Sequence, residues 1–366
     1  MTSIPRGTAA PDPAPGHAAP TDRPAGPVGL VAIGRNEGAR LEACLDSALR
    51  DLPPERVVYV DSGSTDGSVA VAAGRGLRVV RLDPGAGFTA ARARNAGAAA
   101  LARTAAGPPD FVQFVDGDCR VVEGWLDAGL AAMRADPRLA VVAGRRREIR
   151  PEASPFNRLA DMEWNTPVGE ARAVGGDALY RRRAFEAVGG FDGRFICGEE
   201  PELCFRLRAA GWRVRRVDAE MTRHDAAMTR PGQWARRVIR GGWAFAEGAH
   251  RMGGSPERYN VRERDRILVW GGLVPLLVAA LLVLAPFWPP ALLLAGLLLA
   301  LYPAVMLRAA LWRRRRFGDP WPAALLYGAA VMGGKPLEMV GLARFHLAAA
   351  RGERGRLIEY KGAAGG

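Results

Sequence analysis

Cysteine is scarce in this chain of 366 residues, which contains only four and no CxxC pair. Cys44, Cys119, Cys197 and Cys204 lie at long spacings, a pattern that indicates neither a disulfide framework nor a zinc site. A reducing compartment suits these thiols best. The first residues also lack the apolar core of a signal peptide. Residues 1–27, rich in proline, alanine and glycine, are therefore expected to form a disordered leader.

Acidic residues are also in deficit, with 38 Asp and Glu against 51 Lys and Arg and a formal net charge of +13. Such an excess is typical of proteins that bind nucleic acid, anionic lipid or a phosphorylated substrate. Much of it lies around two long uncharged runs, where contact with lipid explains it. No RNA-binding or DNA-binding motif is visible. We therefore expect no nucleic-acid partner, although net charge alone would suggest one.

Short apolar runs alternate with helical patterns in the first part of the chain. "VGLVAIG", which begins at Val28, and "RVVYV", which ends at Val60, are each followed by residues with helical periodicity. "LRVVRL" and "DFVQFV" continue the strand pattern, with another helical segment between them. The alternation predicts an α/β fold with a largely parallel sheet. We assign residues 28–255 to this domain.

Two uncharged stretches follow, and we assign residues 256–320 to them. The first, at about 267–288, has the length that a bilayer core requires of a helix, and the second extends over about 291–311. Their connection is very short, so they are expected to form a transmembrane hairpin. Arginines flank the pair on both sides, which by the positive-inside rule places both ends in the cytoplasm. The sequence thus predicts a multi-pass inner-membrane protein whose α/β domain faces the cytoplasm.

Residues 321–366 are apolar only in pieces, because Gly333-Gly334, Lys335-Pro336 and Glu338 interrupt them. This pattern favours a pair of interfacial helices followed by a basic cytoplasmic tail. The alternative is a third span, which would carry the tail across the membrane. The arginines and aromatic residues between Arg230 and Phe245 likewise predict an amphipathic helix that contacts anionic lipid.

Acidic residues follow several of the predicted strands. Asp61 follows "VVYV", Asp116 and Asp118 follow "FVQFV", and Glu37 lies just beyond "LVAIG". Ligands of α/β sheets bind at the carboxyl ends of the strands, and a divalent cation on a diphosphate needs a few hard oxygen ligands. However, Asp-Gly is also a common turn dipeptide, and Asp61 could cap a helix or a loop turn. From these residues alone, both a structural and a chemical role remain open.

Six segments in order resemble the family-2 glycosyltransferases of the GT-A fold: "VAIGRNEGARLEACLDSAL", "VVYVDSGSTDGS", "ARNAG", "FVDGD", "GGDALYRRRAFEAVGGFDGRF" and "GEEPELCFRLRAAGW". The likeness spans roughly Val28 to Asp225. It implies a Rossmann-like, mixed and mostly parallel sheet that forms the catalytic domain. It also implies transfer of a sugar from a nucleotide-diphosphate donor to a lipid-linked or saccharide acceptor in polysaccharide biosynthesis, with Mn²⁺ or Mg²⁺.

The resemblance assigns the donor side of the site. It implies that Asp116 lies near the ribose and that Asp118, the second aspartate of the DxD motif, binds the metal. Asp61 would read the edge of the nucleobase, and Arg94 would line the nucleotide pocket. Glu37 is assigned to the same substrate-binding group.

The resemblance also assigns the catalytic base. Glu200, preceded by Glu199, stands where the family has the aspartate that deprotonates the acceptor in an inverting transfer. The replacement keeps the carboxylate and lengthens the side chain by a methylene group. Alternatively, both acids only cap a helix that begins near Pro201. The corresponding alternative function is a catalytically degenerate protein that binds nucleotide sugars or acts as a scaffold in polysaccharide assembly.

Three further positions are assigned on weaker likeness. His224 lies where members of this fold place a histidine near the metal; imidazole is an acceptable Mn²⁺ ligand, although a lone histidine is more often a packed residue. Asp177, in the segment that resembles the acceptor side, is expected either to have an architectural role or to contact sugar hydroxyls. Arg236 lies in "QWARR", which is partly similar to the QxxRW signature of processive synthases but lacks its final Trp. We assign Arg236 to substrate binding without inferring processivity.

Overall fold

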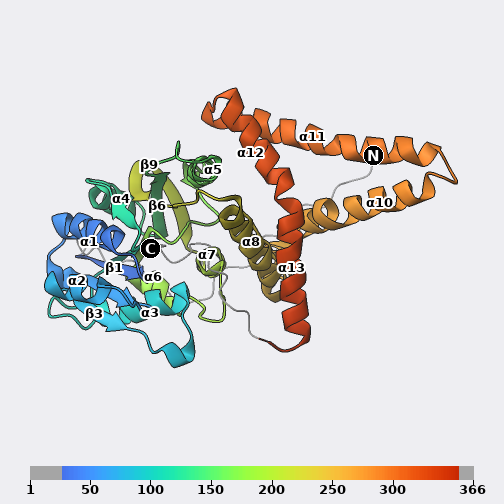
Figure 1. Cartoon of the computed structure of the whole chain (residues 1–366). Helices are drawn as coiled ribbons and strands as arrows, with labels where there is room; N and C mark the ends of the chain where they lie inside the picture. Colours follow the sequence, from blue (N-terminus) through green and yellow to red (C-terminus); the bar gives the residue numbers. More distant parts are fainter. Residues whose placement is uncertain (1–26, 354–366) are drawn as a thin grey trace, which may run out of the picture.

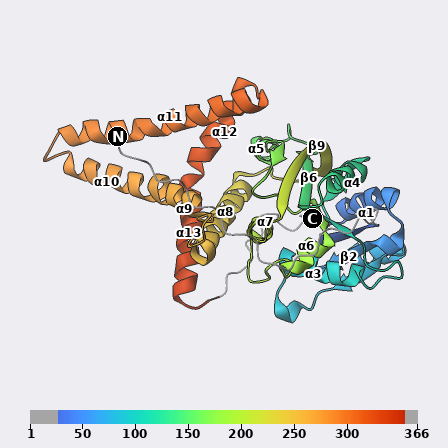
Figure 2. The ribbon, with the colours of Figure 1, turned by 180° about the vertical axis from the view of Figure 1, so that it is seen from behind.

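The computed structural model describes residues 27–353. The expected disordered leader lies almost entirely outside these residues, as does the end of the expected basic tail. The α/β domain forms one end of the molecule, and two long helices project from the opposite side (Figures 1 and 2). Helices α8 (Pro231–Met252) and α13 (Lys335–Ala350) lie between the two parts.

A nine-stranded sheet organises the domain, in the order β3-β2-β1-β4-β8-β6-β9-β5, with β7 paired to β9. The first four strands pair in parallel, whereas β8 is antiparallel to both β4 and β6. The mixed, mostly parallel α/β sheet predicted from the sequence is therefore confirmed. The strands are β1 (Val28–Gly34), β2 (Val57–Asp61), β3 (Arg78–Arg81), β4 (Phe111–Asp116), β5 (Cys119–Val121), β6 (Leu139–Glu148), β7 (Gly169–Glu170), β8 (Ala178–Arg181) and β9 (Arg213–His224).

Helices cover the sheet and bury its central strands, which explains why β1 and β2 read as continuous apolar runs. Helix α3 approaches β1 closely at Gly97, where an added Cβ would lie 2.2 Å from Cγ1 of Val31. The helices of the domain are α1 (Ala39–Asp51), α2 (Ser68–Gly74), α3 (Ala90–Leu101), α4 (Trp125–Ala135), α5 (Pro155–Trp164), α6 (Arg182–Ala187) and α7 (Glu199–Ala209), with short 3₁₀ turns at Pro54–Arg56 and Pro84–Ala86.

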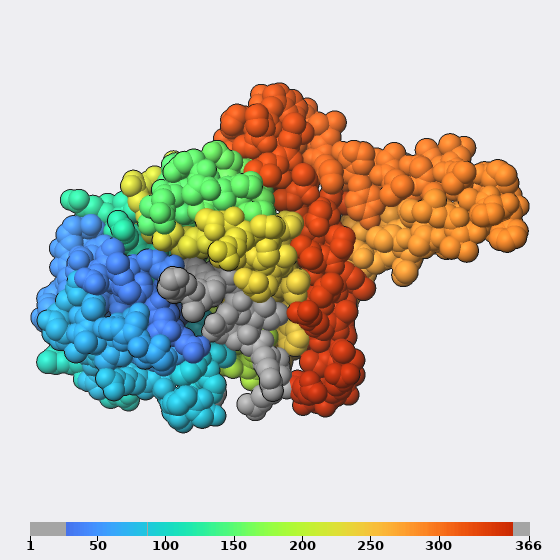
Figure 3. Space-filling view, viewed as in Figure 1, coloured from blue at the N-terminus to red at the C-terminus, as the bar shows by residue number. Residues whose placement is uncertain are grey.

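Two helices are long and apolar enough to cross a membrane, judged by length and composition. One runs over Val261–Leu284 and comprises α9 (Val261–Ile267), a π-helical segment η3 (Leu268–Leu273) and α10 (Val274–Leu284). The other is α11 (Pro290–Phe317). Only 17% and 11% of their most apolar windows are buried, and the pair projects away from the rest of the chain (Figure 3). The two apolar runs identified in the sequence thus lie on exposed, paired helices.

The last described segment forms two helices, α12 (Trp321–Gly333) and α13. Helix α13 packs against α8 by close contact of backbone. An added Cβ at Gly341 would lie 2.0 Å from the carbonyl oxygen of Ile239, and one at Gly242 would lie 2.0 Å from that of Glu338. Residues 321–350 thus contain two helices, and the expectation that they lie at a membrane interface stays a prediction.

Replacing Gly341 by alanine is expected to destabilise the contact between α8 and α13, because the new methyl group would meet the backbone of α8. Overpacking of this kind typically costs about 1–3 kcal/mol. Thermal unfolding of the purified full chain would measure the loss. Gly296→Ala is the matched control, because nothing lies within 4 Å of a Cβ added there. Equal melting temperatures for G341A and G296A would contradict this account of the contact.

Candidate active site

The DxD motif forms the link between two strands. Asp116 ends β4, and β5 begins at Cys119, which pairs with His224 of β9. The amide of Gly117 donates to the carbonyl oxygen of Ile33 at 2.7 Å, and a Cβ added at Gly117 would lie 3.1 Å from that oxygen. Gly117 is therefore explained by close approach to the end of β1. The motif is both a turn and a part of the sheet edge that presents carboxylates. We refer to residues 116–118 as the DxD edge.

The structure brings Asp118 and His224 together, and their assignment to a metal stays a prediction. Oδ2 of Asp118 lies 3.4 Å from Nε2 of His224, and both side chains are buried. The thiol of Cys119 belongs to the same cluster, and the ring of Trp164 packs edge-on against the imidazole at 4.6 Å. A carboxylate oxygen beside an imidazole nitrogen is a donor set that suits Mn²⁺.

Behind His224 lies Glu148, a residue that the sequence analysis missed. Its Oε2 is 3.9 Å from Nδ1 of His224, and within residues 27–353 this buried nitrogen has no hydrogen-bond partner. The carboxylate of Glu148 accepts from the amides of Ala226 at 2.9 Å and Arg150 at 3.1 Å. Carboxylates beyond a ligating histidine commonly fix the orientation of its ring. The donors present therefore fit a divalent cation.

Arg94 pairs with carboxylates of both the DxD motif and the start of α7. Its guanidinium lies 2.9 Å from Oδ1 of Asp116, 3.0 Å from Oε1 of Glu199 and 3.2 Å from Oε1 of Glu200. Burial disfavours the charged form of Arg94, but these carboxylates outweigh it and raise the pKa of Arg94. Gly176 makes room for the side chain, because a Cβ there would lie 2.1 Å from Nη2 of Arg94. Arg94 thus links the DxD edge directly to the start of α7.

Arg146 is a second buried cation, and it was also not predicted from the sequence as a site residue. Its Nη2 lies 2.9 Å from Oδ1 of Asp177 and 3.7 Å from Oδ2 of Asp116. Burial opposes ionisation of Asp116, but Arg94 and then Arg146 outweigh that effect and lower the pKa of Asp116 to about 2. Asp116 is therefore charged at neutral pH.

Asp177 is fully buried below the DxD motif. Its carboxylate accepts from the amide of Asp116 at 3.2 Å and from the hydroxyl of Thr222 at 2.7 Å, besides its ion pair with Arg146. This placement supports the DxD edge from beneath. Contact of Asp177 with sugar hydroxyls stays a prediction.

Glu199 and Glu200 lie at the first turn of α7, after Gly198, whose φ of 81° is left-handed. The side chain of Glu199 is only 3% exposed, whereas that of Glu200 is 18% exposed. Burial and the neighbouring charge of Glu199 raise the pKa of Glu200, although Arg94 opposes this. Glu200 is therefore the more accessible of the two carboxylates, and its proton affinity is higher than that of an ordinary glutamate.

Asp61 shapes the loop that follows β2. Its Oδ2 accepts from the amides of Gly63 at 3.1 Å and Ser64 at 3.0 Å, and the hydroxyl of Tyr59 donates to Oδ1 at 3.3 Å. The structure therefore contains the loop-capping contacts that the sequence left as an alternative. Contact with a nucleobase stays a prediction.

Glu37 and Arg236 lie in different places. The carboxylate of Glu37 pairs with Arg40 at 2.9 Å, and a Cβ added at Gly117 would lie 3.3 Å from Cγ of Glu37, so Glu37 borders the DxD edge. Arg236 is exposed near the start of α8, outside the cluster of ion pairs around Arg94. Its assignment to substrate binding stays a prediction.

Comparison with known proteins identifies the family. Residues 31–189 match the family described as glycosyl transferase family 2, and residues 111–312 match glycosyl transferase family group 2. A pre-mycofactocin glycosyltransferase of Mycobacterium tuberculosis is 32% identical over 240 residues, covering 60% of this chain and 48% of the relative. The chain thus spans about half the length of that relative.

A second relative and a solved structure are also similar to this chain. An N-acetylglucosaminyl-diphospho-decaprenol L-rhamnosyltransferase of Mycobacterium tuberculosis is 31% identical over 237 residues, covering 55% of this chain and 76% of the relative. The solved mannosyltransferase of Pyrobaculum calidifontis, in complex with GDP-Man and Mn²⁺, has the same fold, with a TM-score of 0.52, 20% identity and coverage of 91% and 88% of the two chains. The chain therefore belongs to the family-2 glycosyltransferases and has the GT-A fold.

Proposed function

We propose that this chain is a membrane-anchored, metal-dependent glycosyltransferase that moves a sugar from a nucleotide-diphosphate donor to a lipid-linked or saccharide acceptor. The observation that carries the proposal is the position of Arg94, which pairs with Asp116 on one side and with Glu199 and Glu200 on the other. The buried guanidinium of Arg94 thereby contacts both the DxD edge and the candidate base.

On the donor side, Asp118 and His224 would hold Mn²⁺ or Mg²⁺, and Glu148 would orient the imidazole. When bound, the cation would neutralise the charge that develops on the leaving diphosphate. Asp116, held ionised by Arg94 and Arg146, would contact the ribose. Asp61, Glu37 and Arg94 itself would line the nucleotide pocket.

On the acceptor side, Glu200 would accept the proton of the attacking hydroxyl in an inverting transfer. Its raised pKa suits this task, because a base with greater proton affinity removes a hydroxyl proton more effectively. Glu199 would act as a positioning residue, since its buried carboxylate holds Arg94 and its charge acts on Glu200.

Replacing Glu199 by glutamine is expected to shift the acid limb of the pH profile of sugar transfer to lower pH. Glu200 must be deprotonated to act, so the rate falls as pH drops through its pKa, which burial and Glu199 raise. Removing the charge of Glu199 lowers that pKa. The measurement is kcat/KM against pH, with Glu186→Gln, an exposed change on α6, as the control. An unmoved acid limb in E199Q would contradict the coupling.

The helix pair of residues 261–317 would anchor the enzyme as a multi-pass protein of the inner membrane, with the catalytic domain in the cytoplasm. The apolar composition and exposure of both helices support this proposal, as do the arginines that flank them. Helix α8 would contact anionic lipid. The relative named for a decaprenol-linked sugar supports a lipid-linked acceptor.

The test is a donor screen with the purified full chain, in which UDP-, GDP- and dTDP-sugars are supplied with Mn²⁺, Mg²⁺ or EDTA. Released nucleoside diphosphate reports turnover. We expect release from at least one donor with a divalent cation and none with EDTA. Binding of a donor without any release, with acceptor-containing membranes present, would instead favour the degenerate binding or scaffolding protein.

A further inference from the structure

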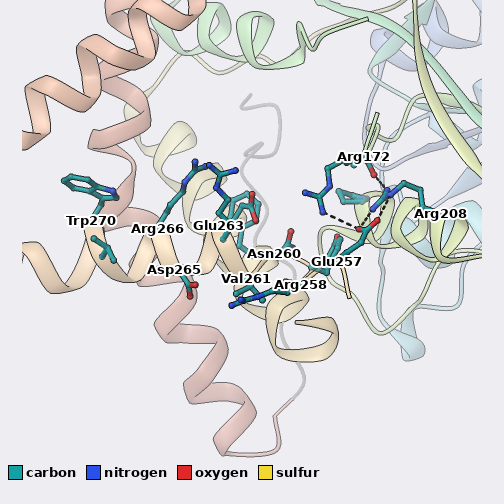
Figure 4. A pocket seen from close by; sticks show the side chains of 16 residues that line it. Arg172, Arg208, Glu257, Arg258, Asn260, Val261, Glu263, Asp265, Arg266 and Trp270 are labelled. Atoms are coloured by element: carbon teal, nitrogen blue, oxygen red, sulfur yellow. Dashed lines mark hydrogen bonds and ion pairs between the residues drawn. The ribbon is translucent and has the colours of Figure 1, made fainter. Parts of the chain in front are cut away.

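A cavity of about 760 Å³ lies between the catalytic domain and the start of the first long helix. Arg172, Pro201 and Arg208 line it on the side of the domain, and residues 257–270 contribute most of the opposite wall. Figure 4 shows the labelled side chains of the two walls on opposite sides of this space. None of the residues assigned above to the donor site lines it.

Unpaired positive charge distinguishes the helical wall. Arg258, Arg262 and Arg266 recur at four-residue spacing, are exposed, and make no ion pair within residues 27–353. In contrast, Arg172 and Arg208 both pair with the single carboxylate of Glu257 (Figure 4). The other acids of the lining are Glu263 and Asp265, and Asp265 pairs with Arg264. Like charges four residues apart destabilise a helix, so a bound anion would stabilise this wall.

The backbone of this wall is also unusual. Arg258 and Asn260 have φ angles of 50° and 55°, a left-handed conformation that non-glycine residues seldom adopt. Between them, Tyr259 is buried and packs against Phe205 of α7 at 5.0 Å. Such conformations persist where surrounding contacts hold them and are concentrated at functional sites. The contact with α7 fixes Arg258 at the rim of the cavity.

The cavity connects two chemically different regions. At one end, Val269 and Trp270 lead into the apolar helix, and the hydroxyl of Tyr302 donates to the carbonyl oxygen of Trp270 at 2.6 Å; Trp and Tyr are typical of the membrane interface. The wall formed by the domain includes Pro201, the residue after Glu200. The first turn of α7 therefore places Glu200 against Arg94 and Pro201 at the cavity.

We propose that this cavity binds the phosphate or diphosphate group of a lipid-linked acceptor. Arg258, Arg262 and Arg266 hold the anion, the lipid chain runs past Trp270 along the apolar helix, and the acceptor sugar extends over Pro201 toward Glu200. This inference rests on the proposed function. The headgroup of a membrane phospholipid and free pyrophosphate offer the same phosphate chemistry, so the experiment separates these sources.

The experiment measures binding of radiolabelled farnesyl diphosphate to the full chain in phosphatidylcholine nanodiscs. EDTA is present, so that the donor site cannot hold the diphosphate through a cation. The double variant R262Q/R266Q is expected to weaken binding by about tenfold or more, since each arginine would donate charge-assisted hydrogen bonds. R308Q/R315Q is the matched control, because it removes two exposed arginines in the C-terminal part of α11, outside the cavity. It should leave binding unchanged.

Several outcomes would overturn the proposal. Equal weakening in both double variants would indicate diffuse attraction, and no weakening in either would exclude these arginines. Displacement of the probe by phosphatidylglycerol would identify a phospholipid site, and equally tight binding of inorganic pyrophosphate would identify a site for free phosphate.

Donor binding on the same preparations keeps this test separate from that of the proposed function. Nucleoside diphosphate with Mn²⁺ should bind equally to the wild type and to R262Q/R266Q. Absence of farnesyl diphosphate binding in the wild type, with donor binding intact, would overturn only the acceptor inference. Absence of donor binding in the wild type would count against the proposed function itself.

Discussion

The Glu200→Gln variant is expected to lose sugar transfer by about 10²–10⁴-fold, the range that a general base contributes, while its affinity for the donor stays close to that of the wild type. Glutamine cannot accept the proton of the acceptor hydroxyl, but it can still accept a hydrogen bond from Arg94, which lies 3.2 Å from Oε1. The network around Arg94 and Asp116 should therefore persist. The measurement is the initial rate of transfer beside a titration with donor and Mn²⁺.

Two control variants test whether the loss of transfer is specific to the carboxylate of Glu200. Glu200→Asp keeps the carboxylate and restores the residue typical of the family, so it should retain part of the activity. Glu186→Gln makes the same chemical change on the exposed face of α6 and should have no effect. Wild-type rates in E200Q would remove Glu200 from the base role and leave its carboxylate as a cap at the start of α7.

The second large effect is expected from Asp118→Asn. This change removes the charge beside His224 while keeping the size of the side chain. We expect Mn²⁺-dependent binding of nucleoside diphosphate to be lost and turnover to fall by about 10²–10³-fold, as for removal of one electrostatic contact to a developing charge. Mn²⁺ titration followed by electron paramagnetic resonance, with nucleoside diphosphate present, would measure the binding.

Asp127→Asn is the matched control for that variant. Asp127 is an exposed residue in the first turn of α4, so the same change there should leave Mn²⁺ binding intact. If D118N bound Mn²⁺ and nucleotide as the wild type does, the assignment of Asp118 and His224 to the metal would be wrong.

The sequence predicted the strand ends because each carries its own local signal. Asp61 and Asp116 end the apolar strands β2 and β4, Asp118 lies two residues beyond β4, and parallel strands bring their carboxyl ends to one edge of a sheet. The signal for the apolar helix pair was equally local, since uncharged runs of that length are rare in soluble domains. These parts of the fold needed no knowledge of how distant segments meet.

The contacts that organise the site are not local and could not be predicted. Arg94 and Glu199 are 105 residues apart in sequence, and Glu148 reaches His224 only because β6 pairs in parallel with β9. Arg146 is the second of three consecutive arginines, and nothing in that run distinguishes it from its neighbours. Its burial depends on the order in which the strands enter the sheet.

The cavity between α7 and α9 had no sequence signal either. Arg262 and Arg266 were expected only as part of the basic flank that orients the helix pair. Their position across from Pro201 depends on the packing of Tyr259 against Phe205. Charge that the positive-inside rule explains therefore also lines a cavity.

Donor binding and turnover, measured on the same preparations of wild type, D118N and E200Q, test the central claim most directly. The claim is that the DxD edge and the Glu199-Glu200 turn form one active site around Arg94. It predicts that D118N loses both Mn²⁺-dependent donor binding and turnover, whereas E200Q binds the donor normally and does not turn it over. Wild-type turnover in both variants, or normal donor binding without turnover in the wild type itself, would contradict the claim.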